Sequence, residues 1–491
     1  MWAPLLNRNV GVQLLYSTLT SFAYSLSQGS FLSNYVLLLG QSTTTVGYLF
    51  ATSGLVNLVL AFPLGYATDR LSRQALLRSG ALFSLAAQGA FAASLQLRSL
   101  PLLFAAAALN GVSSACTGPA LSASFADSVP TGNRTFAFTL LYSGSLAAGG
   151  VGPAAAALFF YTKGNTWALP ALVVVMHAGN AVGAAASFLL FLIKDSAALG
   201  GESEGVLAAA RAKGRRGAAA GDAEEALLRE GGEEAAAAAA AADGVEEEEE
   251  EELSPAERLG LGHQRLRACG ATLTVAHVPY LLFSSDFIIA IGAGMTVAYF
   301  PLFFSQEEGL SPVALSLLFA LVPVLVAGVG LLLVPAARRC GRAPAALLAN
   351  ALGTACLFLL WLALRLPVPA VCALYLVRSA VMNGSAAVQR GLLMDVVPKR
   401  LRGRWSAMEA LTGFTWTGSA LFGGWLVSGG SYTTSFFYTA LIYAGALLVF
   451  LPILPLTRGE RVDGGAPGGG GGAASAPARA VTEKCGRGVN G

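Results

Sequence analysis

The chain alternates between long apolar segments and short polar ones, and this pattern is the main structural signal in the sequence. Crossing the roughly 30 Å hydrocarbon core of a bilayer takes about 20 residues of α-helix. Because lipid offers the backbone no hydrogen-bond partners, we expect each segment of that length to be a membrane-spanning helix. Twelve segments qualify, at residues 11–37, 45–67, 75–96, 101–124, 136–160, 168–193, 280–304, 312–336, 343–364, 368–392, 405–428 and 432–456.

Two long polar segments interrupt this pattern and predict disorder. One contains an alanine run at 235–242 and an acidic run at 246–252, and the other contains a glycine run at 468–472. Low hydrophobicity and blocks of like charge cannot bury enough surface to offset the chain entropy lost on folding. The predicted organisation is an N-terminal six-helix bundle (1–194), a disordered linker (195–270), a second six-helix bundle (271–457) and a disordered tail (458–491).

Composition agrees with a membrane protein and narrows the function. Of 491 residues, 55% are hydrophobic and 12% charged, whereas soluble domains carry roughly 25% charged residues. The net charge is only +3, and no basic patch interleaved with aromatic residues is present, so we expect no nucleic-acid partner. Scattered cysteines, the lack of a phosphate-binding loop motif and the lack of paired carboxylates or clustered histidines predict no metal, no cofactor and no enzyme activity.

Lysine and arginine are distributed unequally between the two sides of the predicted membrane domain. Loops on one side contain Arg70, Arg73, Arg134, Arg338, Arg339, Arg342, Lys399, Arg400, Arg402 and Arg404, whereas loops on the other side contain only Arg98, Lys163 and Arg365. Positively charged loops stay in the cytoplasm. We therefore expect both termini and the linker to be cytoplasmic, while the choice between plasma and organelle membrane stays open.

The two halves of the chain share an internal repeat. Residues 40–51 align with 309–320 at an offset of 269, sharing Gly, Ser and a Leu-Phe-Ala triplet. Residues 127–134 align with 395–402 at an offset of 268, sharing Asp, Pro and Arg. Several coincidences in the same order at nearly one offset indicate that one six-span unit is present twice.

A short charged loop lies between the second and third apolar segments. The sequence Gly65-Tyr-Ala-Thr-Asp69-Arg70-Leu-Ser-Arg73 follows the pattern G-x-x-x-D-R-x-x-R and resembles the loop between helices 2 and 3 of Major Facilitator Superfamily transporters. Together with the repeat, the resemblance covers residues 10–456. It implies an all-α membrane protein with twelve transmembrane helices in two pseudo-symmetric six-helix bundles, which moves a small organic solute by alternating access.

The resemblance also implies a conformational latch at the cytoplasmic ends of the helices. In the family, the loop aspartate faces the start of helix 11, and a loop arginine reaches an acidic residue that ends helix 4. A carboxylate at a helix N-terminus is favoured by the helix dipole. Carried over, the latch would join Asp69 to the helix that begins near Trp405, Arg73 to Asp127 and Arg342 to Asp395, with Gly65 and Arg70 completing the loop; for Arg70 a plain positively charged loop residue is the alternative.

Polar residues inside the apolar segments are candidates for substrate binding. An arginine at the centre of a span costs about 2.5–3.5 kcal/mol and usually faces a cavity or a partner, which makes Arg378 the strongest candidate. Tyr24 and Gln28 lie four residues apart on one face of the first span. Asn110 lies in the fourth span, and in the family helices 1, 4, 7 and 10 line the cavity. The rings of Tyr142 and Trp416 could stack on a solute, although packing is the commoner role for such residues.

Two acidic residues, Asp286 and Glu409, lie inside the seventh and eleventh spans. Either could pair with Arg378, carry a proton or bind a cationic group, and a purely structural ion pair is an equal alternative. Proton-coupled family members often have an arginine three residues before a Gln-Gly pair in helix 4. Here Ala107 precedes Asn110-Gly111. Proton coupling therefore stays open, with H⁺ as the candidate coupling ion.

The alternative to a transporter is a transporter-like sensor or scaffold that binds a solute without moving it. The linker contains no foldable module to carry a signal, which disfavours this alternative. We expect a monomer embedded in the lipid bilayer, with a small-molecule solute as its partner.

Overall fold

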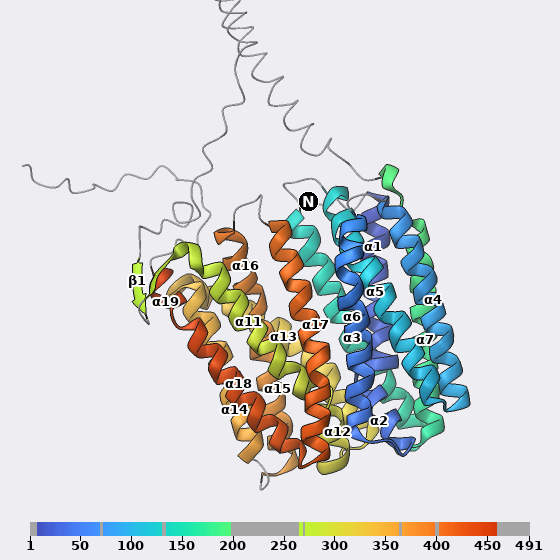
Figure 1. Ribbon diagram of the computed structural model, residues 1–491. Helices are drawn as coiled ribbons and strands as arrows, with labels where there is room; N and C mark the ends of the chain where they lie inside the picture. The colour runs from blue at the N-terminus through green and yellow to red at the C-terminus, as the bar shows by residue number, and fades with distance from the viewer. Residues whose placement is uncertain are drawn as a thin grey trace, which may run out of the picture.

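The computed structural model describes residues 7–68, 72–129, 134–197, 265–268, 271–362, 366–397 and 402–458. These residues form two helical bundles that stand side by side (Figure 1). The elements next to the long undescribed segments all lie at one end of the molecule, called here the linker end. The residues concerned, in or directly next to these elements, are Arg8, Ala197, Arg265 and Arg458. The arrangement confirms the predicted all-α membrane fold of two six-helix bundles.

The first bundle contains α1 to α7. Its elements are α1 (Arg8–Tyr24), a π-helical turn (Ser25–Gly29), α2 (Phe31–Leu38), α3 (Thr43–Thr68), α4 (Arg73–Leu97), α5 (Leu100–Ser128), α6 (Arg134–Thr162) and α7 (Leu169–Leu189), followed by short 3-10 turns at Leu190–Leu192 and Asp195–Ala197. Side-chain hydrogen bonds cap the N-termini of α1 and α4. The Asn7 side chain accepts from the backbone amide of Asn9, and the Ser72 side chain accepts from that of Ala75. Such N-caps satisfy amides that have no partner within the helix.

The second bundle contains α11 to α19 and is preceded by a β-hairpin. Its elements are β1 (Arg265–Ala268), β2 (Ala271–Thr274), a 3-10 turn (Val275–His277), α11 (Val278–Val297), α12 (Phe300–Leu302), a π-helical turn (Phe303–Glu307), α13 (Pro312–Cys340), α14 (Arg342–Leu362), α15 (Val368–Gly384), α16 (Ala386–Val396), α17 (Arg402–Ser428), α18 (Tyr432–Phe450) and α19 (Ile453–Leu456).

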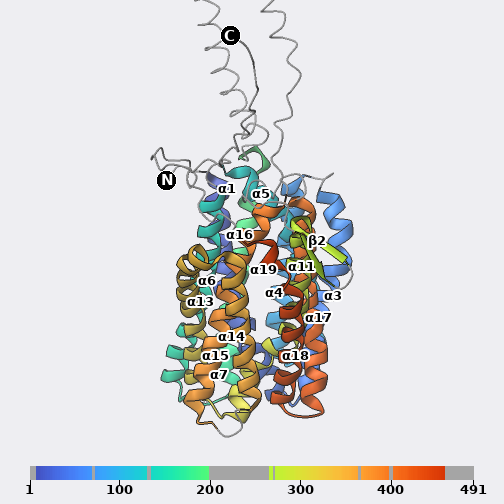
Figure 2. The same ribbon diagram turned by 90° about the vertical axis from the view of Figure 1, so that its left-hand side faces the viewer.

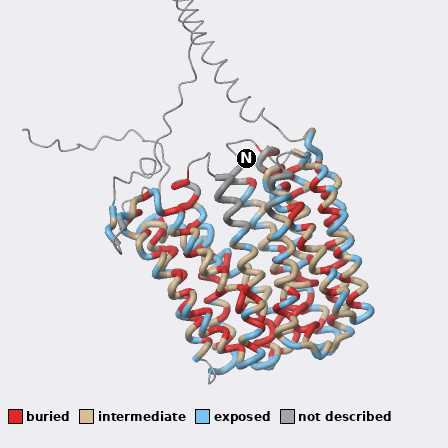
Figure 3. The backbone as a smooth tube through the Cα atoms, in the orientation of Figure 1, coloured by how far each residue is buried: buried red, intermediate tan, exposed pale blue. Residues whose placement is uncertain are grey.

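The outer surface of the bundles is apolar. Within the described residues, ten helical segments are long and apolar enough to cross a membrane. The other two expected spans, 11–37 and 405–428, are helical as well but richer in polar residues and glycine. Large aliphatic side chains such as Leu331 and Leu348 are exposed on the outside. Figure 3 shows exposed and buried positions alternating along the helices, as expected where one face of each helix meets lipid.

The halves contact each other along two helix pairs, α3 with α17 and α6 with α13, which lie side by side in both Figure 1 and Figure 2. Glycines make the first contact close. A Cβ atom on Gly47 would come within 2.7 Å of the Ala420 carbonyl oxygen, and one on Gly424 within 2.9 Å of the Thr43 carbonyl oxygen. Small residues of this kind let membrane helices approach until their backbones touch.

The halves are also joined at the end away from the linker, called here the far end. Six hydrogen bonds connect described residues of the two halves, and all lie there. The Ser305 hydroxyl donates to Asn34 Oδ1 over 2.7 Å, and Trp167 Nε1 donates to the Leu310 carbonyl over 3.0 Å. A hydrophobic cluster that includes residues of both halves, among them Phe31 and Phe300, surrounds these bonds. The far end is therefore closed by polar and apolar contacts together.

Three expected helices are interrupted. The first span contains the π-helical turn Ser25–Gly29, the seventh is broken at Ala298 and Tyr299, and the tenth at Ser385. Local packing explains the first, because α7 approaches it so closely that a Cβ atom on Gly179 would lie 2.8 Å from the Ser27 amide nitrogen. The first two interruptions belong to spans that meet at the far end, where Ser33 Oγ donates to the Ala298 carbonyl over 3.0 Å.

Strand β1 lies inside the range 195–270 for which the sequence predicts disorder, and β2 follows directly after it. Strand β1 pairs antiparallel with β2, and Leu266 stands opposite Leu273. Both leucines pack against a cluster formed by α11, α14, α16, α18 and α19. This apolar surface gives the short strands a place to bury side chains, which the sequence pattern alone does not reveal. The rest of the predicted linker beyond Ala197, and the predicted tail beyond Arg458, lie outside the described residues.

Candidate substrate cavity

A cavity of about 460 Å³ lies mainly within the first bundle, between its helices and α17. This volume is within the range of about 300–1,000 Å³ typical of small-molecule sites. The polar residues that line it are Tyr24, Gln28, Ser53, Asn57, Gln88, Asn110, Ser114 and Thr417; the aromatic ones are Tyr24, Phe50, Phe91 and Trp416. Four of the six residues proposed from the sequence for substrate contact, Tyr24, Gln28, Asn110 and Trp416, line this cavity.

The π-helical turn of the first span positions two of these residues. Tyr24 ends α1, and Gln28 follows four residues later within the turn. The Tyr24 side chain is 44% exposed although it belongs to a membrane-spanning segment. π-helical turns inside α-helices are frequent at functional sites because they redirect side chains locally.

Side-chain amides are the main hydrogen-bonding groups of the cavity. Asn110 Nδ2 donates to Ser53 Oγ over a long 3.5 Å contact. Within the part of the chain that the structure describes, the amide groups of Gln28, Asn57 and Gln88 form no hydrogen bond with protein. Each amide can donate and accept. The cavity therefore offers both kinds of hydrogen bond to a solute.

Asn57 and Gln88 are cavity residues that the sequence analysis did not single out. Asn57 lies on α3 and Gln88 on α4, within the second and third apolar spans. A large amide in an otherwise apolar span was the available signal, the same signal that identified Gln28 and Asn110. The family expectation that helices 1, 4, 7 and 10 line the cavity directed attention away from these two helices.

None of the described residues that line the cavity is Asp, Glu, Lys, Arg or His, so their side chains bring no charge to it at neutral pH. Rings from both halves face it, with Trp416 on α17 and Phe50 and Phe91 on α3 and α4. Aromatic rings present flat apolar surfaces against which a ring of similar size can stack. The arrangement is thus suited to a neutral polar molecule with one flat face.

Arg378 is not among the residues that line the cavity. It lies on α15 inside the second bundle and is only 4% exposed. Its guanidinium carbon lies 5.1 Å from the centroid of the Phe300 ring. Its Nε donates no hydrogen bond to any residue that the structure describes. The strongest candidate from the sequence is therefore separated from the cavity in this conformation.

The remaining candidates lie elsewhere. Tyr142 is 54% exposed on α6 and does not line the cavity. Asp286 is half-buried on α11 and also lies outside the cavity lining. The side chain of Glu409 is outside the described residues.

The structure describes only part of the proposed latch. Asp69 and Arg70 lie outside the described residues, the side chains of Asp127 and Asp395 are not described, and the surroundings of Gly65 are not described either.

Arg342 begins α14, and its Nη1 would lie 3.6 Å from a Cβ atom on Gly391 of α16. Asp395 follows four residues later on α16 and so shares the helix face of Gly391. The guanidinium of Arg342 is thus next to the helix face that carries Asp395.

A carboxylate that the sequence analysis did not consider caps α4. Both Oδ atoms of Asp195 accept a hydrogen bond from the backbone N–H of Gln74, over 3.1 and 3.2 Å. Asp195 belongs to the 3-10 turn Asp195–Ala197 at the end of the first bundle. An anion at a helix N-terminus is stabilised by the free amides and the helix dipole. The start of α4, next to Arg73, is therefore fixed by the end of the same bundle.

Solved structures with a similar fold include several transporters. The D-xylose–proton symporter has a TM-score of 0.61 and 14% identity, covering 92% of this chain and 99% of that one. The bacterial homologue of the iron transporter ferroportin, solved in an inward-facing state, has a TM-score of 0.58 and 15% identity, and the match covers 91% of this chain and 99% of that one. The nucleoside transporter NupG has a TM-score of 0.57 and 11% identity, with the same coverage of 91% of this chain and 99% of that one. By sequence alone, no curated protein is significantly similar.

The sequence itself matches the family model described as Major Facilitator Superfamily over residues 15–240 and 282–482. The two matched ranges include helices of both bundles and together cover most of the chain. The resemblance inferred from the charged loop and the internal repeat is thereby confirmed. The chain belongs to the Major Facilitator Superfamily and is an integral, multi-pass membrane transporter rather than an enzyme.

Proposed function

We propose that this transporter moves a small neutral polar solute by alternating access and binds it in the cavity between the first bundle and α17. The supporting observation is that the described residues lining one cavity combine free amide groups with aromatic faces and include no charged side chain. Burying an ion in an uncharged cavity within the membrane would leave its charge unpaired, at a cost of several kcal/mol. A neutral solute rich in hydroxyl or amide groups avoids this cost.

The closed far end supports an alternating-access cycle. Hydrogen bonds and apolar contacts join the halves there, so the structure is closed on that side. With the linker and termini in the cytoplasm, as the positive-inside bias predicts, this is the inward-facing state. In the opposite state the far-end contacts would separate, and the proposed latch contact between Asp69 and the start of α17 would join the halves at the linker end.

The described residues that line the cavity include no carboxylate or histidine, so a described proton-coupling group would lie outside it. Asp286 is the described candidate, being half-buried within α11. Uptake driven by a pH gradient that is lost in Asp286→Asn, with uptake down a solute gradient retained, would support this role. Equal stimulation of the variant and the wild type would exclude it.

The experiment that tests the proposal is uptake into proteoliposomes. Two structural relatives, a D-xylose–proton symporter and a nucleoside transporter, suggest that a panel of solutes should begin with a pentose and a nucleoside, followed by amino acids, organic anions and organic cations. We expect accumulation of a neutral polar solute. Accumulation of charged solutes only, or binding without accumulation, would contradict the proposal.

Two glutamines on α4 provide a matched pair for locating the site. Gln88 lines the cavity, whereas Gln96, eight residues later, is exposed and pairs with His177 over 3.0 Å. Loss of one hydrogen bond to the solute costs about 1 kcal/mol, so Gln88→Ala should weaken binding roughly fivefold. Gln96→Ala should leave it unchanged. Equal effects of the two substitutions would place the solute elsewhere.

A further inference from the structure

The hairpin β1–β2 is an amphipathic element at the outer edge of the second bundle. Leu266 and Leu273 stand opposite each other and pack against the apolar cluster that includes Val278 and Ile453. Side chains alternate between the two faces of a strand. Arg265 and Arg267 therefore occupy the face that points away from the bundle.

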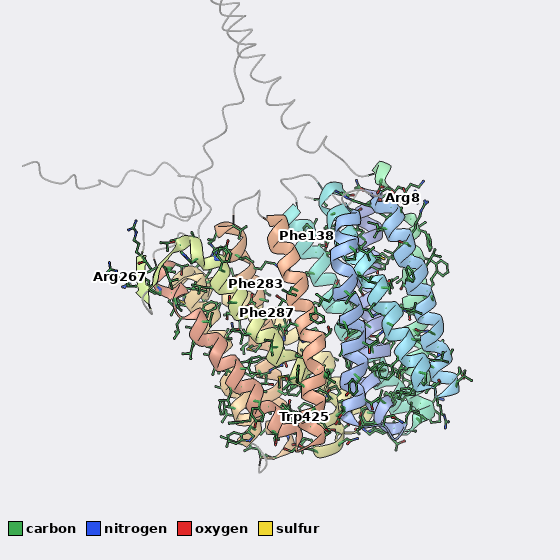
Figure 4. All side chains as sticks on the ribbon, viewed as in Figure 1. Arg8, Phe138, Arg267, Phe283, Phe287 and Trp425 are labelled. Carbon is green, nitrogen blue, oxygen red and sulfur yellow. The ribbon has the colours of Figure 1, made fainter. Side chains whose placement is uncertain are left out.

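This outer face is basic. Both Arg265 and Arg267 are exposed, and Thr272, which pairs with Arg267 across the hairpin, is exposed beside it. Figure 4 shows Arg267 at the outer edge of the molecule, pointing away from the helices. Neither guanidinium group forms an ion pair with a residue that the structure describes. The charge of the face is thus available to a partner.

The hairpin directly precedes one end of a candidate membrane span. Residues 275–307, which follow it directly, form one of the apolar spans. Tyr280, in the first turn of α11, is 58% exposed. Exposed tyrosines at the ends of spans mark the headgroup region of the bilayer. The two arginines belong to the hairpin that directly precedes this end of the span.

We propose that the outer face of the hairpin binds anionic phospholipid headgroups through Arg265 and Arg267. Guanidinium groups bind phosphate oxygens with two parallel hydrogen bonds. The cytoplasmic leaflet is rich in anionic lipid and attracts basic segments next to a span. The proposal depends on the position of the hairpin at the membrane surface and not on the identity of the transported solute.

Lipid binding at this position acts on α11. The hairpin continues through the turn Val275–His277 into α11 without a gap. A hairpin held by headgroups anchors the linker end of this helix, while its other end contacts the first bundle through the Ala298 carbonyl. Anionic lipid thereby restrains one of the interrupted helices during the transport cycle.

Photo-crosslinking tests the proposal directly. The full-length chain carries a photoreactive amino acid in place of Thr272 and is reconstituted in vesicles of equimolar phosphatidylglycerol and phosphatidylcholine. Mass spectrometry then counts the adducts of each lipid. Each basic residue near an anionic surface contributes about fivefold to the preference, so we expect phosphatidylglycerol adducts to dominate by about tenfold or more.

Three variants separate the specific interaction from general charge effects. Arg265→Gln with Arg267→Gln should bring the adduct ratio close to equality, whereas the lysine double substitution at the same positions should retain most of the preference. Arg98→Gln with Lys163→Gln removes two exposed cations at the far end and should change nothing. Added salt should lower the ratio in the wild type, which provides a test even if the glutamine variant fails to fold.

Equal adducts of the two lipids in the wild type would overturn the proposal. Adducts to the acidic run at residues 246–252 of the same chain, in place of lipid, would overturn it as well and assign the basic face to the linker. A loss of preference in the far-end variant as large as that in the hairpin variant would show a charge effect of the whole protein.

Discussion

The guanidinium group of Arg378 donates a hydrogen bond from Nη2 to the hydroxyl oxygen of Tyr443 over 3.1 Å. The two residues come from α15 and α18, and both are buried inside the second bundle. The Phe300 ring lies beside the same guanidinium group, 5.1 Å from its carbon. Because no ion pair to a described carboxylate exists, the aromatic faces and this one hydroxyl are what stabilise the buried cation.

Removing one partner of this pair should destabilise the second bundle. Tyr443→Phe keeps the ring and deletes the hydroxyl, which leaves a buried N–H group of Arg378 without an acceptor. Such an unsatisfied group costs about 1–3 kcal/mol, so the Tm of the purified protein should fall. An unchanged Tm would show that the hydrogen bond contributes no net stability.

The cavity should not depend on Arg378. Arg378→Met keeps an unbranched, flexible side chain and removes the charge from a site that does not line the cavity. We expect the affinity for the transported solute to stay within about twofold, since no contact to the solute is lost. A loss of affinity as large as that of Gln88→Ala would mean that Arg378 reaches the solute after all.

The far-end contacts should separate in each transport cycle. Ser305 and Asn34 belong to different halves and are joined by a direct hydrogen bond. We expect Asn34→Cys with Ser305→Cys to form a disulfide under oxidation and to stop uptake, and reduction should restore it. The background should carry Cys340→Ser, because Cys340 is an exposed free thiol. Uptake that continues through the oxidised protein would contradict alternating access at this interface.

Glycine is required where α3 touches α17. A side chain at Gly47 would meet the Ala420 carbonyl oxygen at 2.7 Å, and backbone atoms cannot rotate away. Gly47→Val should therefore separate the two helices and lower the Tm, by the equivalent of about 1–3 kcal/mol for overpacking. Gly89→Val is the control, since nothing lies within 4 Å of a Cβ atom there. Similar Tm changes in both variants would indicate a loss of helix flexibility rather than a steric conflict.

One carboxyl group outside the spans should make stability depend on pH. Partial burial and the neighbouring Glu307 carboxylate raise the pKa of Glu308. Because the pKa is higher in the folded state, the protonated form stabilises the fold. Its contribution is complete below the ordinary glutamate pKa and is lost as the pH rises through the raised value.

Glu308→Gln imitates the protonated form at every pH. The variant should have a slightly higher Tm than the wild type at neutral pH, and the difference should disappear in acid. Thermal unfolding of both proteins across this range measures it. A difference that persists in acid would come from a cause other than titration of Glu308.

Much of the candidate cavity was predictable because large polar side chains are rare in membrane spans. This signal identified Tyr24, Gln28 and Asn110, which line the cavity together. The same reasoning selected Arg378, which packs among aromatic rings instead. Hydropathy shows that a polar residue needs a partner. It does not show whether that partner is a solute or another part of the protein.

The sequence by itself determined the membrane-spanning helices, their duplication and the family, because span length, the lack of backbone partners in lipid and the repeated motifs are properties of local sequence. Only the tertiary structure decided where the helices are interrupted, which polar residues share a cavity, and that a hairpin covers the edge of the second bundle. These features depend on contacts between segments far apart in the chain, such as Gly179 against the turn at Ser27 and Leu266 against α19. Such contacts leave no periodic pattern in the sequence of either partner.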